Sequence, residues 1–405
     1  MFELFAGRRG RVAAGLLVAE FTAATQSLIV TTVMPRIAAD LHGLSLYGFA
    51  SAALFGGSLI AISFAGPFAD RHGTRRVLAL AFALTLCGLC ASAFAPSMAF
   101  FVAGRGIEGF GGGLDYAVSL TAIAKVFPED LRPRMLAWSS AMWIVPGLVG
   151  PAAGAFIAVT LGWRYVFAVF IPLVIVSAAL VLPALAGMTS VRADADPFGA
   201  LRMLISRDTL LLRDQRSAAI AAFGALQAAF FGADAYVSLL LTAVRGQTLA
   251  LAGLCITLAV VGWTIGSSFQ PRLLERAGTR TIVMAGAVLG IVALSILLCV
   301  ARGAPVVLAY AGWTIGGVGI GVSFSTLTLC AIAGWPKGSE GTASSATLIV
   351  GQLGSVLGVF LCGLPITIAH QSGAPLSAAL TWTFAIALVF ACAMLALAPR
   401  LPSRR

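Results

Sequence analysis

Residues Gly66–Leu78 read GPFADRHGTRRVL, and about half the chain later Pro271–Val283 read PRLLERAGTRTIV. The second stretch is an altered copy of the first, and each copy joins two long apolar stretches. The matching pairs are Asp70 with Glu275, Arg71 with Arg276, Gly73 with Gly278, Thr74 with Thr279 and Arg75 with Arg280. A repeat across the midpoint of a very apolar chain predicts two related halves embedded in a membrane.

The composition of the chain excludes an ordinary soluble fold. Of its 405 residues, 60% are hydrophobic and 10% are charged, whereas a soluble domain has about 25% charged residues. The 45 glycines suit helices that pack closely in lipid. We therefore expect an all-α membrane protein.

Apolar stretches of about 20 residues, long enough to cross about 30 Å of hydrocarbon, predict twelve transmembrane helices. They lie near 12–34, 48–69, 77–95, 98–122, 134–160, 164–186, 217–241, 249–270, 281–301, 304–332, 342–366 and 376–398. The segment 187–216 is rich in charged residues and predicts an aqueous connector. This divides the chain into an N-terminal six-helix bundle (1–186), the connector and a pseudo-symmetric C-terminal six-helix bundle (217–405).

The basic residues predict the orientation of these helices. Most of the 26 Lys and Arg fall in loops on one side, and four arginines fall in loops on the other, namely Arg36, Arg164, Arg245 and Arg302. Basic loops stay in the cytoplasm, so we expect both termini there, in the inner membrane of a bacterium. Topology accounts for the net charge of +11, and a nucleic-acid partner is not needed to explain it.

The cysteines and histidines do not suggest a metal site. All seven cysteines fall within expected spans, and the three histidines lie in separate loops. Cys87 and Cys90 form a CxxC pattern, but no histidine lies nearby in sequence, so packing thiols are the better interpretation. We expect no metal and no cofactor.

The repeated loop resembles a motif of the major facilitator superfamily, G-x-x-x-D-R-x-G-R-[RK]. The matching positions are Gly66, Asp70, Arg71, Gly73 and Arg75–Arg76. Thr74 replaces the usual basic residue after the glycine. The resemblance covers essentially the whole chain and implies alternating access, in which two six-helix bundles rock around a cavity at the midplane of the bilayer.

A latch on the cytoplasmic face is the role we predict for the repeated loop. The glycines allow a tight reversal between helices, and the acid before them can interact with a helix N-terminus or an arginine. The predicted latch residues are Gly66, Asp70, Arg71, Gly73, Arg75, Glu275, Arg276 and Gly278. The alternative is that these arginines only fix the topology.

Three further motifs resemble the drug:H+ antiporter branch, whose members export multiple drugs. Arg105–Gly109 is similar to R-x-x-Q-G, with Glu108 where glutamine is usual. Thr31–Pro35 is similar to the end of the first helix in these exporters, which usually carry an aspartate where this chain has Gln26. Gly162–Phe167 is similar to the turn into their sixth helix.

The expected span 134–160 carries the core of the antiporter motif in Gly150, Pro151 and Gly154. Three glycines of that motif are replaced in this chain, by Ala137, Pro146 and Ala155. A helix with prolines and a small-xxx-small face can bend and pack tightly. The resemblance implies that it seals the transporter against proton leak, and ordinary close packing is the alternative.

Charges inside spans are costly, so each one is a functional candidate. The candidates for proton coupling are Asp115, Glu20, Glu108, Arg105 and Asp234. Asp115 lies deepest in its span and is favoured first, followed by Glu20. Arg105 and Glu108 are three residues apart and can instead form a structural ion pair. Asp234 lies near the outer end of its span, where we expect it to be solvated.

Aromatic and amide side chains supply candidates for substrate contacts, with packing as the alternative. They are Gln26, Tyr116, Trp138, Trp143, Gln227 and Phe231. Acids beside aromatic rings favour lipophilic cations. We therefore expect a monomeric transporter in the lipid bilayer, most simply a drug/H+ antiporter that exports small lipophilic compounds and uses protons as coupling ion. Proton-coupled uptake of a metabolite is the alternative, and an enzyme is disfavoured because no nucleophile–base pair or nucleotide-binding loop is present.

Overall fold

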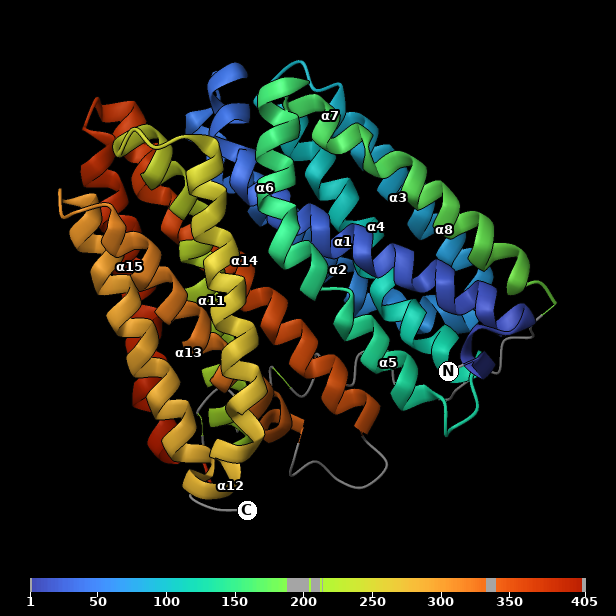
Figure 1. Cartoon of the computed structure of the whole chain (residues 1–405). Coiled ribbons are helices and arrows are strands. Elements are labelled where there is room, and N and C mark those ends of the chain that lie inside the picture. Colours follow the sequence, from blue (N-terminus) through green and yellow to red (C-terminus); the bar gives the residue numbers. More distant parts are fainter. Residues whose placement is uncertain (1, 188–203, 205–211, 213, 333–339, 403–405) are drawn as a thin grey trace. The chain divides into compact units, whose positions relative to one another are not determined.

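The computed structural model describes residues 2–187, 204, 212, 214–332 and 340–402. Helices make up nearly all of that part of the chain, and it contains no strand (Figure 1). The helices are α1 Gly7–Asp40, α2 Tyr47–His72, α3 Thr74–Ala93, α4 Met98–Val126, α5 Arg132–Ala141, α6 Ile144–Thr160, α7 Trp163–Ala168, α8 Phe170–Ala184, α11 Gln215–Leu239, α12 Leu249–Ala301, α13 Val307–Ile332, α14 Glu340–Ser372 and α15 Leu376–Leu397. Ten helical stretches in the described ranges are long and apolar enough to cross a membrane.

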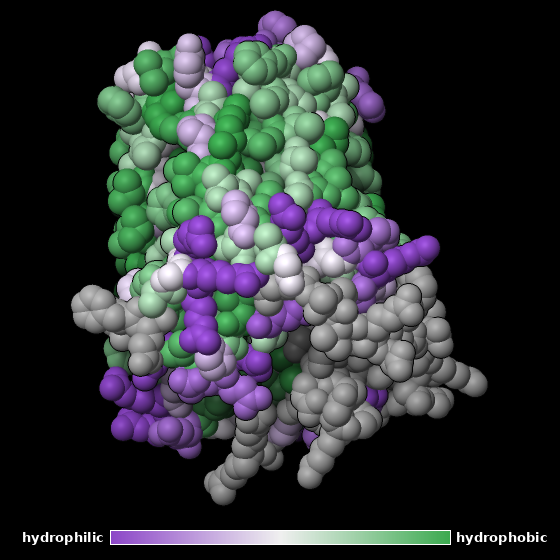
Figure 2. All heavy atoms as spheres, turned by 90° about the vertical axis from the view of Figure 1, so that its right-hand side faces the viewer, coloured by the Kyte–Doolittle hydropathy of each residue, from purple (hydrophilic) through white to green (hydrophobic). Residues whose placement is uncertain are grey.

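The surface of the protein is as apolar as a lipid-facing surface must be. Large hydrophobic side chains point outward, among them Phe156 and Trp382, which are 68% and 67% exposed. On the face shown in Figure 2, hydrophobic residues cover a broad band, and hydrophilic residues gather at its lower edge. Exposed apolar surface of this extent indicates burial in a membrane.

The chain forms two compact units. Met1–Val30 with Ala53–Pro197 make unit 1, and Thr31–Ala52 with Phe198–Arg405 make unit 2. The C-terminal end of α1 and the start of α2 therefore group with the second unit, which the sequence did not indicate. The predicted connector 187–216 lies almost entirely outside the described residues, so the predicted borders at 186 and 217 stay a prediction.

Side-chain contacts hold the segment Thr31–Ala52 in unit 2. The Thr367 hydroxyl of α14 donates to the Ser45 carbonyl oxygen at 2.8 Å. The Tyr236 ring of α11 lies 5.6 Å from the Tyr47 ring, and its hydroxyl donates to the Val359 carbonyl oxygen at 2.7 Å. These contacts make α11 and α14 the neighbours of the α1–α2 turn.

The two copies of the repeated loop adopt the same backbone turn. Gly73 has a φ of +87° between α2 and α3, and Gly278 has a φ of +78° inside α12. Glycine adopts this conformation without the penalty that a side chain brings. The helix α12 has 53 residues and would be about 80 Å long if straight, so Gly278 divides it into two helices. The predicted tight reversals are confirmed.

The arginine two residues after each glycine contacts the C-terminal end of the last helix described in its own unit, or the residues just after that end. Arg75 donates from Nε to the Leu182 carbonyl oxygen of α8 at 3.0 Å, and Arg280 donates to the Pro399 carbonyl oxygen just after α15. Carbonyl groups at helix C-termini lack partners within the helix, and a cation there is favourable. The repeat thus ties the end of the last described helix to each unit, a role that the sequence did not reveal.

Two expected spans are interrupted, in each case one turn before a proline. The span 134–160 breaks at Met142–Trp143, between α5 and α6. The span 164–186 breaks at Val169, between α7 and α8. Pro146 and Pro172 lack the N–H that would bond to the carbonyl four residues earlier. The first break places Trp143 at the residue just before α6.

Three glycines of α4 let α2 and α3 approach its backbone, whereas Gly112 faces open space. A Cβ at Gly109 would overlap the Leu54 carbonyl group, and one at Gly113 would lie 2.6 Å from the Ser58 oxygen. A Cβ at Gly111 would overlap Thr85. Nothing lies within 4 Å of a Cβ at Gly112. Gly112 shares the helix face of Glu108 and Asp115, so this face is open between the two acids.

We expect Gly109→Ala and Gly112→Ala to differ in thermal stability. The first should cost roughly 1–3 kcal/mol because the added methyl group overlaps backbone, and the second should be neutral or stabilising by up to about 1 kcal/mol because alanine favours helices. Thermal unfolding of the purified variants, followed by tryptophan fluorescence, measures both. Equal losses in the two variants would contradict the described packing of α4.

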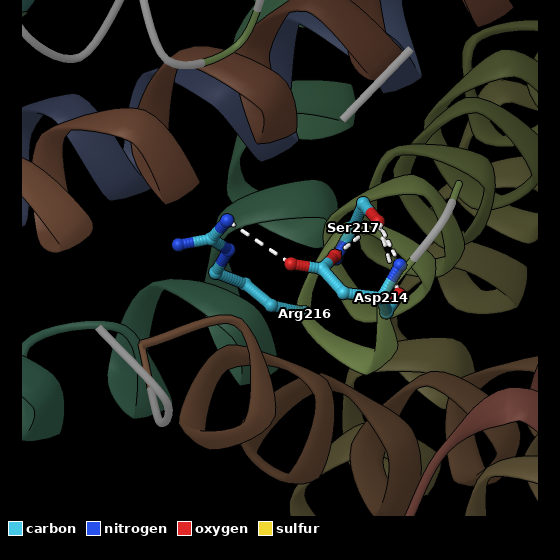
Figure 3. A network of polar contacts seen from close by, with 3 residues as sticks. All are labelled: Asp214, Arg216 and Ser217. Carbon is cyan, nitrogen blue, oxygen red and sulfur yellow. Dashed lines mark hydrogen bonds and ion pairs between the residues drawn. The ribbon is translucent and has the colours of Figure 1, made fainter. Parts of the chain in front are cut away.

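A capping box begins α11, the first long helix of the second half (Figure 3). The Ser217 backbone N–H donates to Asp214 Oδ1 at 2.7 Å, and the Asp214 N–H donates to the Ser217 hydroxyl at 3.2 Å. Arg216 lies 3.0 Å from the other carboxylate oxygen. Burial raises the pKa of Asp214, but the bonds from Ser217 and the charge of Arg216 outweigh it, so the pKa lies below its usual value.

This cap should make a pH-dependent contribution to stability. Because the pKa of Asp214 is lower in the folded protein, the contribution is present above the unfolded-state pKa of about 4 and is lost as the pH falls through the folded-state pKa. Asp214→Ala should cost about 1 kcal/mol at neutral pH. Asp214→Asn keeps the cap but cannot titrate. The difference in unfolding temperature between wild type and this variant should therefore disappear at acid pH. A difference in unfolding temperature that does not change with pH would contradict the contribution of the carboxylate.

Candidate functional site

Four predicted residues come together in unit 1, and we call them the carboxylate cluster: Glu20 of α1, Asp115 and Tyr116 of α4, and Trp143 at the break between α5 and α6. The Trp143 indole N–H donates to Glu20 Oε1 at 2.7 Å. Asp115 and Tyr116 both lie close enough to Glu20 for electrostatic interaction. Tyr116 and Trp143 are 40% and 44% exposed.

The chemistry of the carboxylate cluster suits exchange between a proton and a cation. Two carboxylates within electrostatic range of each other repel when both are ionised, so binding one proton or one cation relieves the repulsion. Asp115 also accepts a hydrogen bond from the Ser119 hydroxyl at 3.2 Å. The half-exposed rings beside the acids offer faces that attract organic cations.

A second polar group lies deeper in the same unit and consists of Arg105 and Glu108 of α4 with Gln26 of α1. Arg105 donates to Glu108 Oε2 at 2.6 Å, which confirms that the two side chains face each other. Both are 2% exposed, and Gln26 is 7% exposed. The Gln26 amide lies beside the Glu108 carboxyl. The Arg105 guanidinium also lies 5.9 Å from the Phe167 ring of α7.

The two groups form two levels along one seam between α1 and α4. On α1, Gln26 follows Glu20 by six residues, which is about 9 Å along the helix axis. On α4, Glu108 precedes Asp115 by seven residues, which is about 10 Å along the helix axis. Because Glu20 lies near Asp115 and Gln26 near Glu108, the helices run antiparallel in matching register. The seam therefore places an acid on α4 at both levels.

Asp234 is buried in unit 2, so the expectation that it is solvated was wrong. It is 8% exposed and accepts a hydrogen bond from the Trp313 indole N–H of α13 at 3.0 Å. Trp313 stacks on Phe230 with 5.0 Å between ring centroids, and Phe230 contacts Phe231 and Trp263 edge-on. The position of Asp234 near the end of its helix hid this burial, because the covering residues come from other helices.

The remaining substrate candidates are not part of the carboxylate cluster. Trp138 packs edge-on against Phe5 at 6.2 Å. Gln227 is buried on α11 next to Gly351 of α14, and Phe231 belongs to the aromatic group around Trp313. Both lie in unit 2, and they stay predictions as substrate contacts.

The antiporter-motif residues of α6 pack against α1. A Cβ at Gly154 would overlap the Ile29 side chain, and one at Gly150 would lie 3.6 Å from it. Gly150, Pro151 and Gly154 are all buried. The structure thus accounts for the small residues by close packing within unit 1.

The predicted latch residues lie at the C-terminal end of α2, at the start of α3 and around the break in α12. Gly66 faces open space, and Arg71, Glu275 and Arg276 are exposed. Arg75 has the contact with α8 described above. Their proposed interplay stays a prediction.

Comparison with known proteins agrees with this architecture. The sequence model of the Major Facilitator Superfamily matches residues 16–359. Multidrug resistance protein 3 of Bacillus subtilis (strain 168) is 22% identical over 87% of this chain and 78% of its own length. A probable multidrug-efflux transporter of Mycobacterium tuberculosis (strain ATCC 25618 / H37Rv) is 26% identical over 84% and 83% of the two chains.

Other relatives match in part or by fold. The multidrug transporter protein MdtP of B. subtilis is 27% identical over 51% of this chain, but the match spans only 38% of its length. The crystal structure of the D-xylose-proton symporter aligns with a TM-score of 0.69 at 18% identity over 97% of both chains. That of a mutant of the nucleoside transporter NupG aligns with 0.72 at 15% identity over 95% and 99%. With its all-helical fold and a family match over most of its length, this chain belongs to the Major Facilitator Superfamily.

Proposed function

We propose that the protein is a proton-coupled multidrug exporter that works by alternating access. The observation that carries the proposal is the carboxylate cluster, in which Glu20 and Asp115 lie within electrostatic range of each other, beside Tyr116 and Trp143, in a family of transporters. Relatives that match over most of their own length bear multidrug names. We propose a small lipophilic cation as substrate and the proton as coupling ion, without a metal, another cofactor or catalytic activity.

We further propose twelve transmembrane helices in two six-helix bundles. Ten stretches qualify by length and hydropathy, and the break at Gly278 makes two helices of α12. The helix α4 has 29 residues but carries Arg105, Glu108 and Asp115, and we count it as the twelfth. An even number places both termini on one side, which the basic loops assign to the cytoplasm of a bacterial cell.

In this proposal the repeated loops and α6 control the conformational change. Asp70, Arg71 and their counterparts Glu275 and Arg276 stabilise one state of the cytoplasmic face as a latch. The tight contact of α6 with α1, through Gly154 and Ile29, prevents proton leak while the bundles move. Uptake of a metabolite by the same fold remains the second candidate, favoured by the missing glycines of the antiporter motif.

Transport in inverted membrane vesicles tests the function and its direction. The vesicle lumen is acidified, and tetraphenylphosphonium is added outside, at the face that was cytoplasmic. An antiporter dissipates the pH gradient as it exchanges lumenal protons for the cation. A symporter does not, because no substrate is inside to leave with the protons. The exporter would be refuted if, for every member of a panel of lipophilic cations, the pH gradient stays intact and cation uptake equals that of vesicles without the protein.

A further inference from the structure

Three buried polar atoms of the deeper level lack hydrogen bonds in this structure: Glu108 Oε1, Arg105 Nε and Gln26 Nε2. All three side chains are more than nine-tenths buried. Buried polar atoms in proteins are nearly always bonded, so several unsatisfied atoms in one place call for an explanation. Here they belong to an acid, a base and an amide that lie next to one another.

The two oxygens of Glu108 have different surroundings. Oε2 accepts the 2.6 Å bond from Arg105. Oε1 has no partner with ordinary hydrogen-bond geometry, but the Gln26 amide of α1 approaches the same carboxyl closely enough to interact with it. From α3, the neighbour of Glu108 is Gly88, where a Cβ would overlap the Glu108 backbone. The neighbours of Glu108 that these contacts identify are one cation on its own helix, one neutral amide from α1 and a glycine from α3.

A glutamine can bond to a carboxyl group in both of its protonation states. Its NH2 donates to an ionised carboxylate, and after a half-turn of the amide its oxygen accepts from a protonated one. A guanidinium has donors only, so Arg105 favours the ionised form and cannot bond to the proton. Oε1 is thus the oxygen that can take up a proton without loss of the bond between Oε2 and Arg105.

We propose that Glu108 is a second proton-holding group and that Gln26 is its positioning residue, which bonds to Oε1 whether or not it carries a proton. A proton from water on one side of the membrane binds Oε1, and its O–H then donates to the Gln26 amide oxygen. When the proton leaves to water on the other side, the amide turns back and its N–H donates to Oε1. This inference rests on the proposed proton-coupled transport and extends it to the deeper level of the seam.

The arrangement also gives α1 a part in the coupling. The Gln26 amide belongs to α1 and the acid to α4, so each change of protonation changes the bond between these two helices. Glu20 and Asp115 are the nearest other acids on the two helices, one level away, about 10 Å along the axis. The open face at Gly112 lies between the two levels on α4.

Infrared spectroscopy of the purified protein in lipid tests the proposal without any substrate. The carbonyl band of protonated carboxyl groups is recorded during a pH titration for wild type, Glu108→Gln and Gln26→Leu. We expect Glu108→Gln to remove one component of the band. We expect Gln26→Leu to keep that component but shift it to higher frequency, because the protonated group loses its hydrogen bond. Glu108→Gln keeps an oxygen for Arg105, and thermal unfolding checks that both variants are folded.

Two infrared outcomes would overturn the proposal. A full band in Glu108→Gln would show that Glu108 does not hold the proton. An unshifted component in Gln26→Leu would show that Gln26 is not its partner. Either result leaves the exporter function standing, whereas an absence of transport across the panel of lipophilic cations, together with the expected infrared result, would refute only the function.

An exchange of the acid and the amide provides a second test that does not depend on a single variant folding. The double variant Gln26→Glu/Glu108→Gln keeps the size, charge and hydrogen-bonding groups of the level but moves the acid to α1. We expect it to transport tetraphenylphosphonium at least several-fold faster than Glu108→Gln alone. Transport no better than that single variant, at equal expression, would contradict an interchangeable acid–amide pair.

Discussion

Replacement of Asp115 by asparagine is expected to lower substrate-driven proton movement by roughly a hundredfold, the scale of a positioned proton-transfer group. Asparagine keeps the size of the side chain and its bond to Ser119, but it cannot bind and release a proton. It also removes the repulsion with Glu20, so the cluster no longer gains from exchanging a proton for a cation. The measurement is the collapse of an imposed pH gradient in inverted vesicles when tetraphenylphosphonium is added.

Two matched variants serve as comparisons for Asp115→Asn in this experiment. Ser119→Ala removes the 3.2 Å bond to Asp115 but keeps the acid, so we expect a loss of only a few-fold. Asp234→Asn removes a buried acid of unit 2 that is already bonded to Trp313, so it tests whether any buried acid matters equally. Undiminished proton movement in Asp115→Asn would remove this residue from the coupling.

The second large effect is expected in stability. Arg105→Met leaves Glu108 as a buried charge without its ion-pair partner, which should cost about 3–5 kcal/mol. The double variant Arg105→Met/Glu108→Met removes both charges and should regain most of this loss, because an apolar pair of similar volume is often as stable as a buried ion pair. Thermal unfolding in detergent compares the two variants directly.

The double variant also separates stability from transport. If the ion pair is only structural, Arg105→Met/Glu108→Met should both fold and transport. If Glu108 holds a proton, the variant should fold but transport poorly. A single variant Arg105→Met as stable as wild type would contradict the buried ion pair itself.

Much of the fold was predictable because it depends on local sequence. The glycines of the repeated loop predicted two tight reversals, and both have positive φ angles. The spacing of Arg105 and Glu108 predicted their ion pair, since residues three apart on a helix are neighbours. Hydropathy predicted the helices, but it missed the breaks before Pro146 and Pro172, where a lost backbone bond outweighs a continuous apolar pattern.

The partnerships across helices were not predictable, because they depend on the register between elements far apart in the chain. Glu20 was a candidate for its charge, yet nothing near it in sequence indicates Trp143 as a partner. Gln26 was interpreted as a substrate contact, whereas the register of α1 against α4 places it beside Glu108. Asp234 was expected in solvent because it lies near the end of its span. Its burial was missed because Trp313, on another helix, supplies it.

The contacts of Arg75 and Arg280 bear on how the two related halves of one chain can diverge. Both arginines bond to main-chain oxygens, at Leu182 and Pro399, and every residue type supplies such an oxygen. Substitutions in the receiving segments therefore leave the attachment intact, while the donor arginine cannot be exchanged as freely. Ancestral similarity should then persist in the donor loops and fade at the helix ends that receive them, and in this chain the likeness is still readable at the loops.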